Sequence, residues 1–159
     1  MIEARTTPAV GSVVTSGPTR ERQRIRALLF SDDIAIRDAV RLAVGRRPAR
    51  DVEVESWHEC ATADAVRECA QAGGFDVFIL DGEARPYGGL GLCRELKHSI
   101  YECPPVIVLT GRVQDGWLAS WSFADHVVPH PLDPLAMAAA VAQAARDHRS
   151  ARPAGVARP

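Results

Sequence analysis

Residues 75–81 (Phe-Asp-Val-Phe-Ile-Leu-Asp) constrain the fold more than any other stretch of this chain. They are mostly apolar, are rich in β-formers and lack helical spacing, which predicts a strand buried on both faces. Strands of this kind belong to parallel sheets that helices cover on both sides. In open sheets of that class, ligands bind outside the carboxyl ends of the strands. Because Asp81 ends the strand, the sequence predicts a functional site at this edge of the sheet.

Strand and helix patterns alternate five times along the chain. The predicted strands are residues 25–30, 52–56, 75–81, 104–110 and 125–129, and the predicted helices are residues 34–46, 60–72, 90–98, 114–122 and 134–148. Such alternation implies a parallel sheet with right-handed crossovers. We therefore expect a flavodoxin-like α/β fold, a doubly wound five-stranded parallel sheet in the order 2-1-3-4-5. That order brings Asp32, Asp81 and Thr110 together at one edge of the sheet.

The composition predicts one domain at residues 24–148, between two disordered tails. Residues 1–23 and 149–159 show no periodicity, and Gly, Pro and Arg recur in both segments. A net charge of -1 gives the chain no field that would draw it to nucleic acid or to an anionic membrane. The sequence has no signal-peptide core and no apolar run long enough to cross a bilayer. We therefore expect a cytoplasmic protein that binds no nucleic acid and does not insert into the membrane.

The four cysteines, at positions 60, 69, 93 and 103, match no known arrangement of reactive or bridging thiols. Their spacing is neither a secretory disulfide framework nor a metal-ligand pattern, and no base is adjacent to any of them. We expect reduced thiols that are mostly packed in the interior. Because no nucleophile–base pair is present elsewhere either, we expect that the protein is not an enzyme.

The residues at the strand ends resemble those of the receiver domain of bacterial two-component response regulators. The resemblance extends from residue 25 to about residue 146. It implies that Asp81 accepts a phosphoryl group, with residues 88–90 (Gly-Gly-Leu) ending its loop, and that Thr110 contacts that group. It also places Ser31 and Asp32 at the two acidic metal-binding positions. His130 stands where the family has a lysine that pairs with the phosphoryl group.

Four short segments resemble a narrower family. Actinobacterial orphan single-domain receivers that accompany the proton-pumping NADH dehydrogenase (complex I) are similar at residues 80–84, 108–112, 115–121 and 128–134. This resemblance implies a protein partner in the peripheral arm of that enzyme. It also implies a location at the inner face of the membrane through that partner.

The candidate metal ligands are Asp32, Asp81 and Glu83. Carboxylates suit Mg²⁺, but Ser31 removes one charge and one strong ligand from the acidic pair, so we expect weak or absent Mg²⁺ binding. The alternatives are that Asp32 and Asp33 only cap the following helix and that Glu83 is a solvated loop residue.

Two further positions depart from the receiver pattern. His130 is shorter than lysine, and imidazole is mostly neutral near pH 7, so a fixed cation is lost even if the ring contacts a phosphoryl oxygen. The alternative is that His130 is a turn residue with no ligand. Val127 stands where many receivers carry an aromatic residue whose rotation reports phosphorylation.

The last two predicted helices present a candidate contact face. Trp117 and Trp121 lie one helical turn apart, and the final helix is apolar nearly all round, which suggests cover on both sides. We expect a partner to bind the side chains of Trp117, Trp121, Leu135, Met137 and Val141. The alternative is that the tryptophans belong to the core and that the alanines are only good helix formers.

Two functions remain open at this stage. The first is a stand-alone receiver of phosphorelay signalling, without an output domain and with a degenerate phosphoacceptor site, which receives phosphoryl groups from a histidine kinase and acts through protein contact. The alternative is a phosphorylation-independent accessory or docking subunit of the respiratory NADH:quinone oxidoreductase. Asp81 and Thr110 favour the first function, whereas Ser31 and His130 favour the second.

Overall fold

The computed structural model describes residues 21–152, which alternate between strands and helices as the sequence predicts. The elements are β1 (Gln23–Phe30), α1 (Ile34–Val44), β2 (Val52–Cys60), α2 (Ala63–Ala72), β3 (Val77–Asp81), α3 (Gly89–Ser99), β4 (Val106–Thr110), the 3-10 helix η1 (Val113–Asp115), α4 (Gly116–Ser122), β5 (His126–Pro129) and α5 (Pro134–Ala151). Most of the two predicted tails, residues 1–20 and 153–159, lies outside the described residues. None of the helices in the described part is long and apolar enough to span a bilayer.

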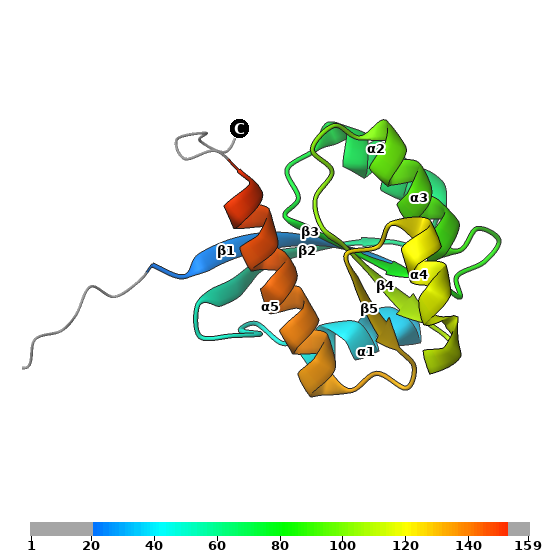
Figure 1. The fold of residues 1–159 in the computed structure, drawn as a ribbon. Coiled ribbons are helices and arrows are strands. Elements are labelled where there is room, and N and C mark those ends of the chain that lie inside the picture. The colour runs from blue at the N-terminus through cyan, green and yellow to red at the C-terminus, as the bar shows by residue number, and fades with distance from the viewer. Residues whose placement is uncertain (1–20, 153–159) are drawn as a thin grey trace, which may run out of the picture.

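The five strands form one parallel sheet in the order β2-β1-β3-β4-β5. This order confirms the predicted doubly wound α/β fold. It leaves β2 and β5 as the two edge strands and puts β3 at the centre. Figure 1 shows the sheet edge-on, with helices on both of its sides.

Two apolar cores cover the two faces of the sheet. On β3, Val77 and Ile79 point to one side, where α1 and α5 pack, and Phe78 and Leu80 point to the other, where α2 and α3 pack. Figure 1 shows the same division, with α4 beside α3. All five residues of β3 are buried, as predicted for a central parallel strand.

Local capping residues determine where most helices begin and end. The side chains of Asp33, Thr62 and Asp133 accept hydrogen bonds from backbone N–H groups in the first turns of α1, α2 and α5. Helix α1 ends at Val44, two residues earlier than predicted, because Gly45 takes a backbone φ of 63° that favours glycine. Helix α5 continues to Ala151, so residues 149–151 of the predicted tail are helical.

Strand β2 is longer than the predicted residues 52–56 and contains a β-bulge. It pairs with β1 as far as Cys60, but the register shifts so that Ile25 faces Val54 while the next residue, Arg26, faces Ser56. Glu55 is therefore an extra residue on β2, which reverses the faces that the following side chains occupy. The reversal decides which face of the sheet carries the side chains of His58 and Cys60.

An ion pair joins the carboxyl-terminal half of α5 to the start of β2. The guanidinium of Arg146 donates two hydrogen bonds to the carboxylate of Asp51, at 2.9 and 2.7 Å. This contact lowers the pKa of Asp51 to about 2. Because both side chains remain about 40% exposed, water screens the pair, and its contribution to stability is modest.

Candidate functional site at the carboxyl edge of the sheet

Asp81 ends β3 at the carboxyl edge of the sheet, and both of its carboxylate oxygens accept hydrogen bonds. The side chain is buried, with 3% of the residue exposed. The hydroxyl of Ser31 donates to Oδ2 at 2.7 Å, and the backbone N–H of Glu83 donates to Oδ1 at 2.9 Å. The site therefore holds the carboxylate in one orientation and satisfies its charge with two donors.

Ser31 follows β1 directly and is fully buried. Its Oγ accepts a hydrogen bond from the backbone N–H of Asp33 at 3.1 Å, and its hydroxyl donates a hydrogen bond to Asp81. The guanidinium of Arg37 donates to the Ser31 carbonyl at 2.6 Å. These contacts place the hydroxyl of Ser31 against Asp81, which confirms that the ends of β1 and β3 converge.

The two aspartates after Ser31 have different roles. The Asp33 carboxylate accepts a hydrogen bond from the backbone N–H of Ala35 at 2.8 Å and so caps α1. The capping alternative therefore holds for Asp33. Asp32 is exposed and does not cap the helix, so its carboxylate remains available to a ligand.

Close backbone approaches shape the loop that follows Asp81. A Cβ at Gly82 would lie 2.5 Å from the carbonyl oxygen of Leu109, and a Cβ at Gly89 would lie 2.6 Å from the carbonyl oxygen of Asp81. Neither position has room for a side chain. The glycines thus let β4 and the start of α3 approach the end of β3 closely.

Thr110 and His130 lie on the other side of Asp81, at the ends of β4 and β5. The backbone N–H of His130 donates to the carbonyl of Thr110 at 2.8 Å, so the two residues are neighbours. The Thr110 hydroxyl donates to the carbonyl of Arg112 at 3.2 Å, and its predicted contact with a phosphoryl group stays a prediction. The His130 side chain is half-buried and makes no hydrogen bond within residues 21–152.

Glu83 leans towards the loop after β4. A Cβ at Gly111 would lie 2.8 Å from the Glu83 carboxylate, so the side chain occupies space that a larger residue at 111 would fill. Three metal ligands must lie close together, but within residues 21–152 the oxygens of Asp32, Asp81 and Glu83 do not all come within 4.8 Å of one another. Sequence reasoning grouped these three residues more tightly than the fold does.

The residues present fit one Mg²⁺ ion. Asp81 and the exposed Asp32 offer hard carboxylate oxygens, and Mg²⁺ is commonly bound through one or two carboxylates with water completing the shell. Ser31 contributes only a neutral hydroxyl, and that hydroxyl already donates a hydrogen bond to Asp81. Two protein charges are therefore the most that this donor set offers to the ion.

The predicted tryptophans lie on the surface, so the core alternative for them is wrong. Trp117 is 70% exposed and Trp121 is 49% exposed, both on α4. The guanidinium of Arg94, on α3, lies 4.8 Å from the centre of a Trp121 ring and donates to the Trp121 carbonyl at 2.6 Å. Together with the exposed Val127 and Leu135, these tryptophans form what we call the α4–β5–α5 face.

Two of the predicted partner-binding residues are not on that face. Met137 and Val141 are fully buried and belong to the core beneath α1 and α5. Their prediction as partner contacts is therefore wrong. The apolar composition of α5 reflects packing against the sheet on one side, while Leu135 is 81% exposed on the other.

All four cysteines are free, in agreement with the predicted thiols. Burial raises the pKa of the Cys60 and Cys93 thiols to about 12. The prediction that no cysteine has an adjacent base is wrong, because Cys69 Sγ lies 3.1 Å from His58 Nε2. Nothing in the spacing of residues 58 and 69 indicated this contact.

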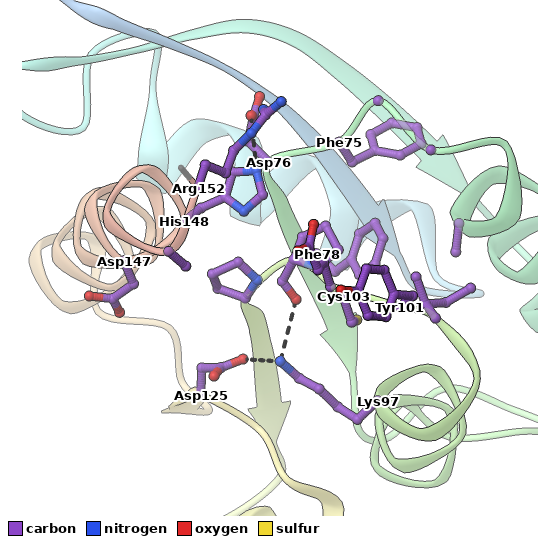
Figure 2. A pocket seen from close by; sticks show the side chains of 18 of the residues that line it. Phe75, Asp76, Phe78, Lys97, Tyr101, Cys103, Asp125, Asp147, His148 and Arg152 are labelled. Atoms are coloured by element: carbon purple, nitrogen blue, oxygen red, sulfur yellow. Dashed lines mark hydrogen bonds and ion pairs between the residues drawn. The ribbon is translucent and has the colours of Figure 1, made fainter. Parts of the chain in front are cut away.

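A cavity of about 480 Å³ lies at the opposite, amino-terminal edge of the sheet (Figure 2). Lys97 spans part of it and donates to the carboxylate of Asp125 at 2.6 Å, as Figure 2 shows. On the α5 side, His148 lies 3.5 Å from the buried carboxylate of Asp76. None of Ser31, Asp81 and Thr110 lines this cavity, so it is separate from the edge of the sheet that carries Asp81.

Comparisons with known proteins agree with this fold. Among solved structures, the CheY-like receiver domain protein of Methanospirillum hungatei has a TM-score of 0.62 at 18% identity and covers 80% of this chain and 98% of that chain. A Francisella response regulator receiver domain also has a TM-score of 0.62, at 13% identity, and covers 80% of this chain and 99% of that chain. These likenesses show a receiver fold. No protein-family model matches the chain.

A curated relative is much more similar in sequence. An uncharacterized response regulatory protein of Mycobacterium tuberculosis is 45% identical over 113 residues, which span 71% of this chain and 85% of that protein. The chain therefore belongs to the response regulator family, with Asp81 at the end of β3 in its receiver fold.

Proposed function

We propose that this receiver domain acts through contact with another protein and that its phosphoacceptor site is degenerate. The observation that carries the proposal is the 2.7 Å hydrogen bond from the Ser31 hydroxyl to Asp81 Oδ2. In receivers, the position of Ser31 is usually acidic and serves the metal. Here the hydroxyl at the same position donates a hydrogen bond to the proposed phosphoacceptor.

Two features of the site should lower the reactivity of Asp81. A carboxylate oxygen must attack phosphorus, and hydrogen bonds on both Oδ1 and Oδ2 stabilise the unreacted carboxylate. The incoming phosphoryl group also needs positive charge around it. Ser31 adds no negative charge that would hold Mg²⁺, and His130 replaces a permanent cation. Both departures weaken stabilisation of the transferring group.

We expect little phosphorylation of the wild-type protein by a small phosphodonor. After incubation with acetyl phosphate and excess Mg²⁺, intact-mass spectrometry should show well under one phosphoryl group per chain. Any label should disappear in Asp81→Asn, because Asp81 is the carboxylate at the end of β3. Rapid, stoichiometric labelling that Asp81→Asn abolishes would contradict the degenerate site.

The exposed α4–β5–α5 face favours a second candidate, a docking subunit that does not need phosphorylation. Trp117 and Leu135 are each at least 70% exposed, and aromatic side chains are common anchors of protein interfaces. Arg94 packs against Trp121 and holds it in place, which reduces the entropy lost when a partner binds. The narrower family resemblance nominates the peripheral arm of the respiratory NADH dehydrogenase as this partner.

Trp117→Ala should decide between the two candidates. Truncating a hot-spot tryptophan costs at least about 2 kcal/mol, so we expect roughly 30-fold weaker capture of NADH dehydrogenase subunits from cell extract. Tyr101→Ala is the matched control, because Tyr101 is 90% exposed and lies outside this face. Capture should also survive Asp81→Ala. Recovery that depends on Asp81 and is indifferent to Trp117 would instead favour a phosphorylation switch.

A further inference from the structure

Three side chains at the β2 edge of the sheet combine one imidazole with two thiols. His58 and Cys60 belong to β2, and Cys69 belongs to α2. Their ligand atoms, one from each residue, all lie within 4.8 Å of one another. The Sγ of Cys69 is 3.1 Å from Nε2 of His58. Within residues 21–152, no other group of three His, Cys, Asp or Glu side chains meets this spacing.

The fold assembles this cluster through the bulge in β2. His58 and Cys60 are two residues apart on one strand, so both side chains project from the same face. The extra residue at Glu55 directs them to the face that α2 covers, where Cys60 packs in the core. On α2, Cys69 follows the buried Val66 by three residues and therefore lies on nearly the same side of the helix.

The cluster is open to solvent on one side and rigid on the other. Cys60 is buried, Cys69 is half-buried and His58 is exposed, so an ion can enter from the surface. The ring of Phe75 packs beside the His58 ring, with their centres 5.7 Å apart. The three ligands therefore come from two elements that the core already holds in place.

We propose that His58, Cys60 and Cys69 bind a Zn²⁺ ion, with water in the fourth position. Zn–S bonds of about 2.3 Å and Zn–N bonds of about 2.0 Å in a tetrahedron require ligand atoms roughly 3.5–3.8 Å apart. The observed cluster needs only small side-chain movements to reach that spacing. Thiolate and imidazole ligands also select Zn²⁺ over Mg²⁺ and Ca²⁺. Each thiol gives up its proton to solvent when the metal binds.

This metal site lies close to the phosphoacceptor edge but shares no residue with it. The carbonyl of Cys60 accepts a hydrogen bond from the backbone N–H of Ser31 at 3.2 Å, so bound Zn²⁺ fixes the strand end beside Ser31. Asp81 takes no part in the cluster. The inference therefore does not depend on the proposed function, and either can fail without the other.

Metal titration of the reduced, chelator-treated full chain tests the site. The wild type should bind one Zn²⁺ in competition with a chromophoric chelator, and bound Co²⁺ should show tetrahedral bands with thiolate charge transfer. His58→Ala and Cys69→Ser should weaken binding by about 100-fold or more, since losing even an outer partner of a metal ligand costs 10–100-fold. Cys103→Ser, which removes a half-buried cysteine outside the cluster, should bind like the wild type.

Zn²⁺ should also raise the melting temperature of the wild type and of Cys103→Ser but not that of Cys69→Ser. This second measurement separates metal binding at the cluster from loss of folding in a variant. The proposal is overturned if the reduced wild type takes up no Zn²⁺, or if Cys69→Ser binds the ion as tightly as the wild type does. A Co²⁺ complex without thiolate charge transfer also overturns it.

Discussion

Replacing Met137 with alanine is expected to lower the free energy of unfolding by about 2–5 kcal/mol. Met137 is fully buried between α5 and the sheet, in the core that α1 and α5 share. Truncation removes apolar contacts and leaves a cavity that the surrounding strands cannot fill. Urea denaturation followed by circular dichroism would measure the loss. A domain of this size has only about 5–15 kcal/mol of stability, so the effect is large.

Leu135→Ala is the matched control for that experiment. Leu135 lies on the same helix, two residues earlier, but is 81% exposed. Its truncation should change the free energy of unfolding by less than about 0.5 kcal/mol. Equal effects of the two substitutions would show that α5 does not pack with Met137 towards the sheet. The pair therefore separates the core side of α5 from its contact side.

The double substitution Ser31→Asp with His130→Lys is expected to speed phosphorylation of Asp81 by acetyl phosphate at least about tenfold, or ~1.4 kcal/mol of barrier. Ser31→Asp removes the hydroxyl that donates to Asp81 Oδ2, and its carboxylate supplies a charged oxygen ligand for Mg²⁺. The lysine restores a permanent cation at position 130, which lies beside Thr110 in the fold. The rate is read from intact mass against time, at saturating Mg²⁺.

Ser31→Ala with His130→Lys separates the two causes at position 31. It removes the hydrogen bond to Asp81 but adds no carboxylate, so we expect a smaller gain than with Ser31→Asp. A double substitution that labels no faster than the wild type would show that some other feature limits the site. In that case, Ser31 and His130 would not account for weak phosphorylation.

The sheet and the edge that carries Asp81 follow from the sequence alone. Apolar runs such as residues 75–81, rich in β-formers and ending in a polar residue, favour a strand covered on both faces, and β3 and β4 are buried throughout. The order of alternating elements then leaves few topologies. Capping by Asp33 is also a local property, since the side chain contacts its own helix. These features depend on near neighbours in the chain, which is why sequence reasoning reaches them.

Helix α5 shows where composition stops being informative. Residues 135–145 of this helix are apolar nearly all round, so no periodicity distinguishes the side that meets the sheet from the side that meets solvent. Packing against the sheet buries Met137 and Val141 in the core and leaves Leu135 exposed to solvent. The sequence of the helix could not show which of the three side chains is buried, because burial depends on the sheet against which the helix packs.

The cluster of His58, Cys60 and Cys69 was decided only by tertiary structure. A regular strand that starts at the buried Val52 would place residues 58 and 60 on the α1–α5 face, away from Cys69. The extra residue at Glu55 reverses them. A bulge belongs to the pairing of β2 with β1, so the alternation of one strand cannot reveal it. The sequence alone predicted a strand only at residues 52–56 and put Cys60 in the next helix, whereas pairing with β1 extends β2 to Cys60 and decides which face carries the imidazole and the thiol.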